Sequence, residues 1–148
     1  MTKKYFIAII LFCCPLLNFA QKSDSLQLMR SVAFDWNAIN VVETKTGEKR
    51  QFFNSATSTL DNVELHVTTL KPGEMGHLPH QHPEEEMTIV KEGMVEVLVN
   101  GELKTLGPGS VIFSAANQMH SIKNVGKTNA TYFAIKWRTA KTGSVKKN

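Results

Sequence analysis

The sequence has only two cysteines in 148 residues, Cys13 and Cys14, and both lie near its N-terminus. The rest of the chain therefore has no means of forming an internal disulfide. It also lacks a phosphate-binding loop, because Gly107-Pro108-Gly109 is followed by no helical pattern and no P-loop lysine. Nucleotide-driven chemistry thus has no support in the sequence.

Net charge is also low. The 17 basic and 13 acidic residues give a formal net charge of +4, which falls to +2 without Lys3 and Lys4. No basic patch remains that would predict a nucleic-acid partner. Lysines gather only near the C-terminus, and residues 139–148 are predicted to be a flexible tail.

The N-terminal segment has the layout of a secretory signal peptide. Two lysines precede an apolar stretch at residues 5–17, and the segment ends at Ala20. The stretch is shorter than the roughly 20 residues that a spanning helix needs, and Pro15 interrupts it, so no permanent membrane span is predicted. We therefore predict residues 1–20 as a signal peptide cleaved near Ala20, and a mature chain that is exported to the periplasm or secreted.

Two alternatives for this segment are weaker. A buried N-terminal helix would need a polar face beside its apolar one, and none is present. A lipid-modified cysteine would need a small residue before it, but Phe12 precedes Cys13 and Cys13 precedes Cys14. Both cysteines would leave with the signal peptide, so the mature domain would contain none.

The pattern beyond residue 40 indicates an all-β chain. Short runs rich in Val, Ile, Thr and Phe predict strands at residues 50–53, 63–70, 87–91, 94–99, 110–113, 120–123 and 131–137. Asn100-Gly101, between residues 94–99 and 102–106, predicts a hairpin, because a type I′ turn needs positive φ at both central positions. Strands at this spacing suggest a sandwich or a closed barrel.

The chain is long enough for one domain with a real core, since folds of this size bury roughly 70% of the surface that the unfolded chain exposes. We place that domain at residues 41–138. Residues 21–40 alternate poorly and are predicted to be a leader that drapes over the domain and enters it around Trp36.

The most informative segment is residues 72–93, where His80 and His82 are two residues apart. In an extended chain this spacing sends both imidazoles to one face. Glu86 would join them if the chain stays extended past Pro83, and two imidazoles with a carboxylate suit a transition metal. Each feature alone is more often an ordinary surface feature, so the prediction depends on their combination.

Other residues bear on this site. His120 lies on a predicted strand, and alone it would more often be a satisfied histidine than a ligand. His77 is expected to be an exposed loop histidine, with a role as a base or substrate contact as the alternative. The direction of His66 depends on the strand register. Glu84 and Glu85 would be rival ligands only in a different register.

Together these segments resemble the two motifs of the cupin superfamily. The first family motif has a glycine, then His-x-His, three or four residues, a Glu, six residues and a Gly. His80, His82, Glu86 and Gly93 follow this spacing, whereas Gly73 lies one residue farther from His80 than is usual. The loop leading into the site is therefore expected to bulge.

The second family motif is a glycine, five residues, Pro-x-Gly, two residues, a His, three residues and an Asn. Gly109, His120 and Asn124 match its spacing, while Ala115 replaces the proline and Asn117 replaces the glycine. Asparagine tolerates the left-handed backbone that such a glycine often adopts, so these departures are mild.

The resemblance implies a small single-domain, RmlC-like cupin with a jelly-roll-like β-barrel, also described as a double-stranded β-helix. It implies that His80, His82, Glu86 and His120 are metal ligands that face the interior. These residues would hold one divalent transition metal, whether Mn, Fe, Ni, Co or Zn. Because cupins commonly pair through edge strands, the resemblance also allows a homodimer.

Three hypotheses describe what such a site does. One is a metal-dependent oxygenase, isomerase or lyase acting on a small polar molecule, since one cupin scaffold supports all of these. Another is a non-enzymatic module that binds a sugar, an organic acid or the metal itself, and a third is a barrel with vestigial histidines. Residues 72–93 also look like the barrel halves of ureidoglycine aminohydrolase-like cupins, a local likeness that does not extend to their substrate.

Overall fold

The computed structural model describes residues 28–142 of the chain. The predicted signal peptide and its cleavage point therefore lie outside the described residues. No helix of the described part is long and apolar enough to cross a membrane. The described part contains a 3-10 helix, η1 (Trp36–Ala38), and the strands β1 (Val41–Thr44), β2 (Gly47–Ser55), β3 (Asn62–Leu70), β4 (Glu85–Glu92), β5 (Val95–Val99), β6 (Glu102–Leu106), β7 (Val111–Ser114), β8 (Ser121–Asn124) and β9 (Ala130–Arg138).

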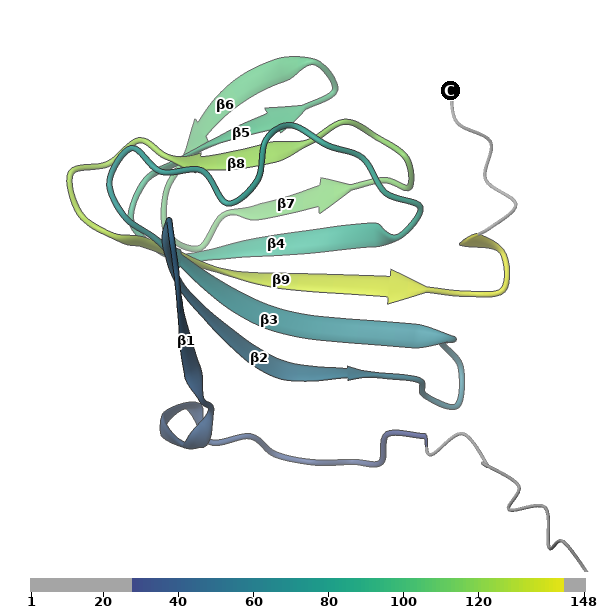
Figure 1. Cartoon of the computed structure of the whole chain (residues 1–148). Helices are drawn as coiled ribbons and strands as arrows, with labels where there is room; N and C mark the ends of the chain where they lie inside the picture. The colour runs from purple at the N-terminus through teal and green to yellow at the C-terminus, as the bar shows by residue number, and fades with distance from the viewer. Residues whose placement is uncertain (1–27, 143–148) are drawn as a thin grey trace, which may run out of the picture.

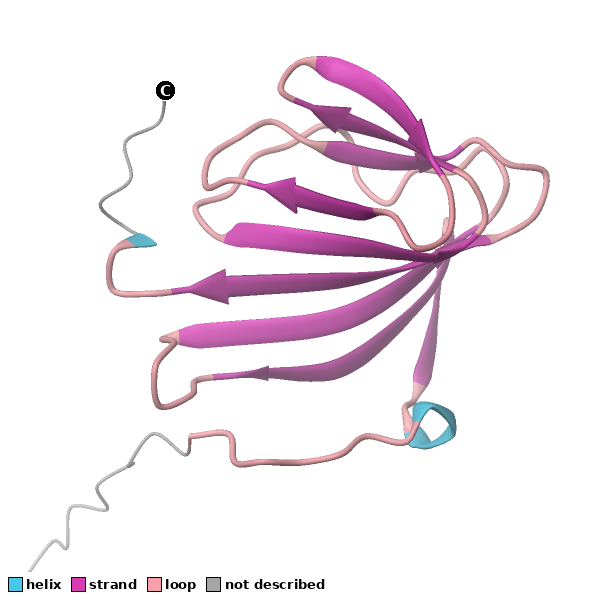
Figure 2. Ribbon diagram, turned by 180° about the vertical axis from the view of Figure 1, so that it is seen from behind, coloured by secondary structure: helices cyan, strands magenta, loops and turns pink. Residues whose placement is uncertain are grey.

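The strands form two antiparallel sheets that face each other (Figure 1). The larger sheet has six strands in the order β1-β2-β3-β9-β4-β7, and the smaller has three in the order β6-β5-β8. Figure 2 shows the same two layers from behind, joined by loops at the ends of the strands. This arrangement is a jelly-roll-like β-barrel, which confirms the predicted all-β fold class.

The hairpin between β5 and β6 forms as predicted. Val99 pairs with Glu102, which leaves Asn100 and Gly101 as a two-residue turn. Both turn residues have positive φ, 52° for Asn100 and 79° for Gly101, as a type I′ turn requires. The turn therefore fixes the register between β5 and β6.

The core lies between the two sheets. Val95 and Val97 of β5 pack against Val90, Ile112 and Ala130 of the larger sheet. Burying one aliphatic side chain of this kind stabilises a fold by about 1.5–3 kcal/mol. Because side chains alternate along a strand, the register that buries these residues also decides which residues of β3, β4 and β9 face inward.

The described part of the predicted leader lies against the outer face of the larger sheet. Asp35 caps η1 by accepting a hydrogen bond of 2.9 Å from a backbone N–H of that helix. The Trp36 ring lies 6.1 Å from the rings of both Phe52 and Phe133, measured between centroids. Phe34 stacks on Phe53 of β2, and these aromatic contacts hold the described part of the leader on the domain.

Gly93, the last glycine of the first motif, occupies a position that only glycine fits. Its φ is 81°, and a Cβ built there would lie 2.6 Å from the Cα of Ala130 on β9. Gly109 has a similar φ of 83° but nothing within 4 Å of the corresponding Cβ position. A substitution at either glycine would therefore cause the same backbone strain. Only at Gly93 would the new side chain also collide with a neighbouring strand.

We expect Gly93→Ala to lower the free energy of unfolding by at least about 3 kcal/mol, because left-handed strain adds to overpacking against β9. Gly109→Ala should cost about 1–2 kcal/mol, since only the backbone strain applies. Urea unfolding of the two variants beside the parent chain measures both values. Equal losses in the two variants would contradict this account of Gly93.

Candidate metal centre

The two sequence motifs meet through the backbone at the histidines themselves. His80 N–H donates to the His120 carbonyl at 3.1 Å, and His120 N–H donates to the His80 carbonyl at 2.9 Å. Asn117 N–H donates to the His82 carbonyl at 2.8 Å. These three hydrogen bonds fasten the loop before β4 to the loop before β8, so the three imidazoles must lie close together.

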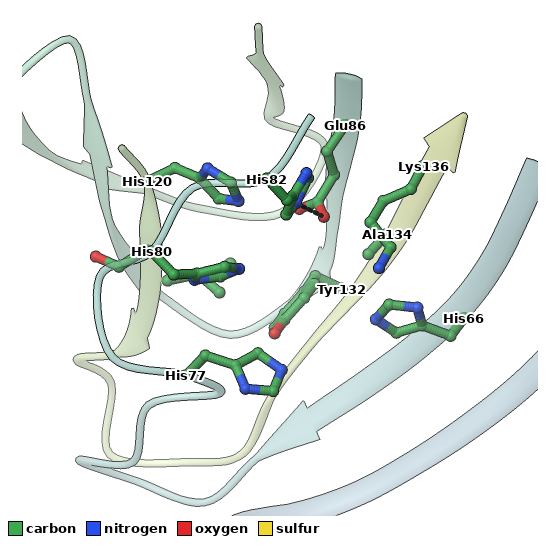
Figure 3. Close-up of a pocket in the computed structure, with 11 residues that line it drawn as sticks. His66, His77, His80, His82, Glu86, His120, Tyr132, Ala134 and Lys136 are labelled. Carbon is green, nitrogen blue, oxygen red and sulfur yellow. Dashed lines mark ion pairs between the residues drawn. The ribbon is translucent and has the colours of Figure 1, made fainter. Parts of the chain in front are cut away.

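The rings of His80, His82 and His120 form a compact triad, shown in Figure 3. The ring centroids of His80 and His120 are 4.6 Å apart, and those of His82 and His120 are 4.9 Å apart. One ligand atom from each ring lies within 4.8 Å of those of the other two. Three histidines placed this way can hold a metal ion.

Each ring of the triad is held by a hydrogen bond from its Nδ1 atom to a nearby backbone carbonyl. His80 donates to Leu78 at 3.1 Å, His82 to Glu84 at 3.1 Å and His120 to Gln118 at 2.8 Å. A carbonyl oxygen only accepts, so Nδ1 must carry the proton in all three rings. In a neutral ring the Nε2 atom is then left with a free lone pair, the form that ligates metals.

The free Nε2 atoms provide a test of whether a metal fits this place. Those of His82 and His120 are buried and have no hydrogen-bond partner. A buried polar atom without a partner is costly, and native proteins seldom leave one without a reason. A divalent ion bound to these lone pairs would supply the missing partner, so the triad fits a transition metal.

Glu86 brings a carboxylate to the same place from β4. Its Oε2 atom lies 3.6 Å from His82 Nε2, drawn as a dashed line in Figure 3, and its Oε1 atom accepts a hydrogen bond of 3.1 Å from Thr88. Burial would raise the pKa of Glu86, but its neighbours His82, His120 and Thr88 together lower it. Glu86 is therefore held as an anion beside the triad.

The pKa values of the first two histidines shift in opposite directions, for different reasons. Contact with Glu86 raises the pKa of His82 despite the burial of that ring. Burial and the neighbouring His120 lower the pKa of His80, which favours its neutral form. The Glu86 carboxylate thus favours a positive charge beside His82 Nε2, whether a proton or a bound cation supplies it.

The path of the chain through the site differs from the predicted one. His80 forms an isolated bridge and His82 lies in an irregular loop, and the chain bends at Pro83 and Glu84 before β4 begins. The imidazole rings therefore come together because His80 is bridged to His120, and not because the chain from His80 to Glu86 is one extended strand. Asn117 has a φ of 59°, as expected of a residue that replaces the motif glycine.

The two glutamates that precede Glu86 both point away from the inner face of the His82 ring. The Glu85 carboxylate accepts a hydrogen bond of 2.8 Å from Trp137 Nε1, so it is directed away from the triad. Glu84 lies 3.5 Å from His82 Nδ1, on the side of the ring opposite to Nε2. Neither carboxylate competes with Glu86 for the inner face of the ring.

An open cavity extends from the triad across the inner face of the larger sheet. It encloses about 480 Å³ including its mouth, and it is lined by the triad with Glu86, His66, His77, Ser121, Ile122, Tyr132, Ala134 and Lys136. His77 is exposed at the edge of this cavity, and His66 faces into it. The register that the sequence left open for His66 thus points that ring inward.

Tyr132 and Lys136 line the cavity without having been predicted. Both lie on β9 and alternate with outward residues such as Phe133. The sequence shows this alternation, but only the sheet order shows which of the two faces lines the cavity. Burial raises the pKa of Tyr132 to about 12, although a hydrogen bond with Thr68 opposes the shift. Its phenol therefore stays neutral throughout the physiological range.

These features define a double-sheet β-barrel with a histidine-lined cavity at one side, and the sequence carries the corresponding family signature. Residues 66–136 match the family model described as Cupin domain. The protein is a member of the cupin superfamily. No curated protein matches the sequence.

Solved structures share the fold at low sequence identity. An RmlC-like cupin from Shewanella frigidimarina superposes with a TM-score of 0.60 at 17% identity, covering 78% of this chain and 96% of that one. A sugar phosphate isomerase of the cupin superfamily from Silicibacter pomeroyi has a TM-score of 0.60 at 17% identity, covering 73% and 76%. A predicted oxalate decarboxylase from Thermotoga maritima has a TM-score of 0.58 at 19% identity, covering 72% and 99%. Such likeness extends to the fold alone.

Proposed function

We propose that the protein is an exported, metal-dependent enzyme that acts on a small polar molecule. His80, His82, His120 and Glu86 would be the ligands of one divalent transition metal. The observation that carries the proposal is the triad itself, whose Nδ1 atoms are all engaged by backbone carbonyls while two Nε2 atoms are buried without a partner. That arrangement orients three lone pairs for a cation before any cation is present.

The surroundings of the triad support an enzyme more than a storage site. A bound divalent ion with open positions supplies Lewis acidity toward an oxygen atom of a ligand. The triad opens onto a cavity, and the facing side carries the ionisable side chains of His66 and Lys136. These groups can orient a ligand and exchange protons with it at the side away from the triad. Export is supported by the N-terminal pattern of residues 1–20 and by the lack of cysteine beyond it.

Metal-loaded protein tests the proposed activity. The chelated chain is reloaded anaerobically with Mn, Fe, Ni, Co or Zn, then screened for oxygen uptake and for turnover of hydroxy acids, sugars and sugar acids. We expect turnover with at least one metal, and none from the chelated protein or from a His82→Ala variant. A protein that binds metal yet turns over no class and consumes no oxygen would be a binding module and would refute the enzymatic proposal.

A further inference from the structure

The side of the cavity facing the triad carries a charged cluster centred on Glu64. Its carboxylate lies 2.9 Å from His66 Nδ1, 3.3 Å from Lys136 Nζ and 3.7 Å from Lys49 Nζ. Glu64 and Lys136 are register partners on β3 and β9, and His66 follows two residues later on the same face. Figure 3 shows His66 and Lys136 across the cavity from His80 and His120.

The charges of this cluster do not balance. The single carboxylate of Glu64 pairs with the ammonium groups of both Lys49 and Lys136, and its side chain is only 14% exposed. Burial would raise the pKa of Glu64, but Lys136, His66 and Lys49 together lower it, so the carboxylate is fully charged near neutral pH. One positive charge thus exceeds what Glu64 compensates.

Two other carboxylates lie nearby, and both have partners of their own. Glu48 pairs with Arg50 at 3.2 Å. Glu86 is the register partner of Lys136 on β4, and a metal held by the triad would take up its charge. In this respect the inference rests on the proposed function. With the metal bound, the inner face beside Lys136 carries a net positive charge and attracts an anion.

His66 presents a different group to the cavity. Its Nδ1 atom donates to Glu64, so a neutral ring leaves Nε2 as a hydrogen-bond acceptor. Burial and the nearby Lys49 lower the pKa of His66, which favours that neutral ring. A neutral Nε2 acceptor does not attract an anion, but it can accept a hydrogen bond from a hydroxyl group.

We propose that Lys136 and His66 bind a small hydroxy acid, whose anionic group pairs with Lys136 Nζ and whose hydroxyl donates to His66 Nε2. The rest of the ligand would then reach the triad. Glu64 is a positioning residue for His66, whose Nδ1 atom it holds, and it competes with the ligand for Lys136. Both side chains line the same cavity as the triad, so one small molecule can contact all of them. The anionic group can be a carboxylate or a phosphate, since both pair with an ammonium group.

Malate and three matched analogues test the proposal by calorimetry on the zinc-loaded chain. Succinate lacks the hydroxyl, the distal monoamide of malate lacks the second charge, and the distal phosphonate analogue replaces one carboxylate by a phosphate-like group. We expect malate or the phosphonate analogue to bind about tenfold or more tightly than the monoamide, because a hydrogen bond to a charged group contributes at least that factor. The tighter of the two identifies the anionic group.

Variants then assign the effect to the named side chains. Lys136→Met should remove the preference over the monoamide, whereas Lys136→Arg should retain it. Lys104→Met is the matched control, because Lys104 also pairs with a glutamate, Glu102 at 3.6 Å, but on β6 away from the cavity. His66→Phe should remove only the preference for malate over succinate, the analogue that lacks the hydroxyl.

Glu64→Gln is expected to strengthen anion binding, whereas Lys136→Met weakens it. The amide oxygen can still accept from His66 Nδ1, while the negative charge that competes for Lys136 is gone, so anion binding should tighten severalfold. A merely structural ion pair would show no such gain.

Zinc content is measured in every sample, which separates the two proposals. If the triad holds no zinc, the proposed function fails. If zinc is bound but malate and its phosphonate bind no better than the monoamide, or equally well to Lys136→Met, the hydroxy-acid site is overturned.

Discussion

Replacing His82 with alanine is expected to lower the affinity for a divalent transition metal by more than about 100-fold, since even residues that only support a metal ligand contribute 10–100-fold. His82 supplies a buried Nε2 atom without another partner, and it also bonds the loop before β4 through its ring. Glu86→Ala should weaken binding less, because three imidazoles remain. Elemental analysis of the natively loaded protein beside the two variants gives metal per chain, and a chelator titration gives the affinities.

His77→Asn is the matched control for both variants. The His77 ring lies 5.5 Å from that of His80, between centroids, and lines the same cavity, but it is not part of the triad. Its replacement should leave the metal content unchanged. Unchanged metal content in His82→Ala and Glu86→Ala would refute the site altogether.

The second large effect is expected at Asn124, whose side chain is fully buried. Its Nδ2 atom donates to the carbonyls of Leu70 at 2.9 Å and Thr128 at 2.8 Å, and its Oδ1 atom accepts from Gly126 N–H at 2.9 Å. Alanine would leave all three backbone groups without this partner. Since each unsatisfied buried group costs about 1–3 kcal/mol, Asn124→Ala should lower the free energy of unfolding by at least about 3 kcal/mol.

Urea and thermal unfolding measure this loss, with Asn129→Ala as the control. Asn129 is exposed on the same loop, and its replacement should change stability by less than about 0.5 kcal/mol. Metal content per folded Asn124→Ala chain should stay that of the parent, because Asn124 holds β8 to the rest of the barrel and touches no triad ring in these hydrogen bonds. A loss in Asn124→Ala no larger than that in Asn129→Ala would contradict this role.

The sequence was informative where local chemistry decides structure. The Asn100-Gly101 turn and the tolerance of Asn117 for a left-handed backbone both follow from backbone sterics, and the structure bears them out. The convergence of His80, His82 and His120 was also predicted. That prediction came from a family resemblance, since spacing alone gives no reason for residues of different loops to meet.

The pairing of strands that are far apart in the chain could not be predicted from the residues alone. β9 lies between β3 and β4 in the larger sheet, although it follows both in the chain by many residues. That insertion brings Lys136 between Glu64 and Glu86, and no local pattern encodes it. For the same reason the inward direction of His66 could not be assigned until its strand register was known.

The backbone bridge between His80 and His120 has a consequence for how strongly an ion can be held. The two residues are joined by a reciprocal pair of peptide hydrogen bonds. Ion capture by flexible ligands must close the intervening chain, and for a loop of about 40 residues that ordering carries a substantial entropy cost. In this barrel the closure is completed by folding itself. The free energy of coordination is then available for affinity and for selection among metals, rather than for assembling the ligands.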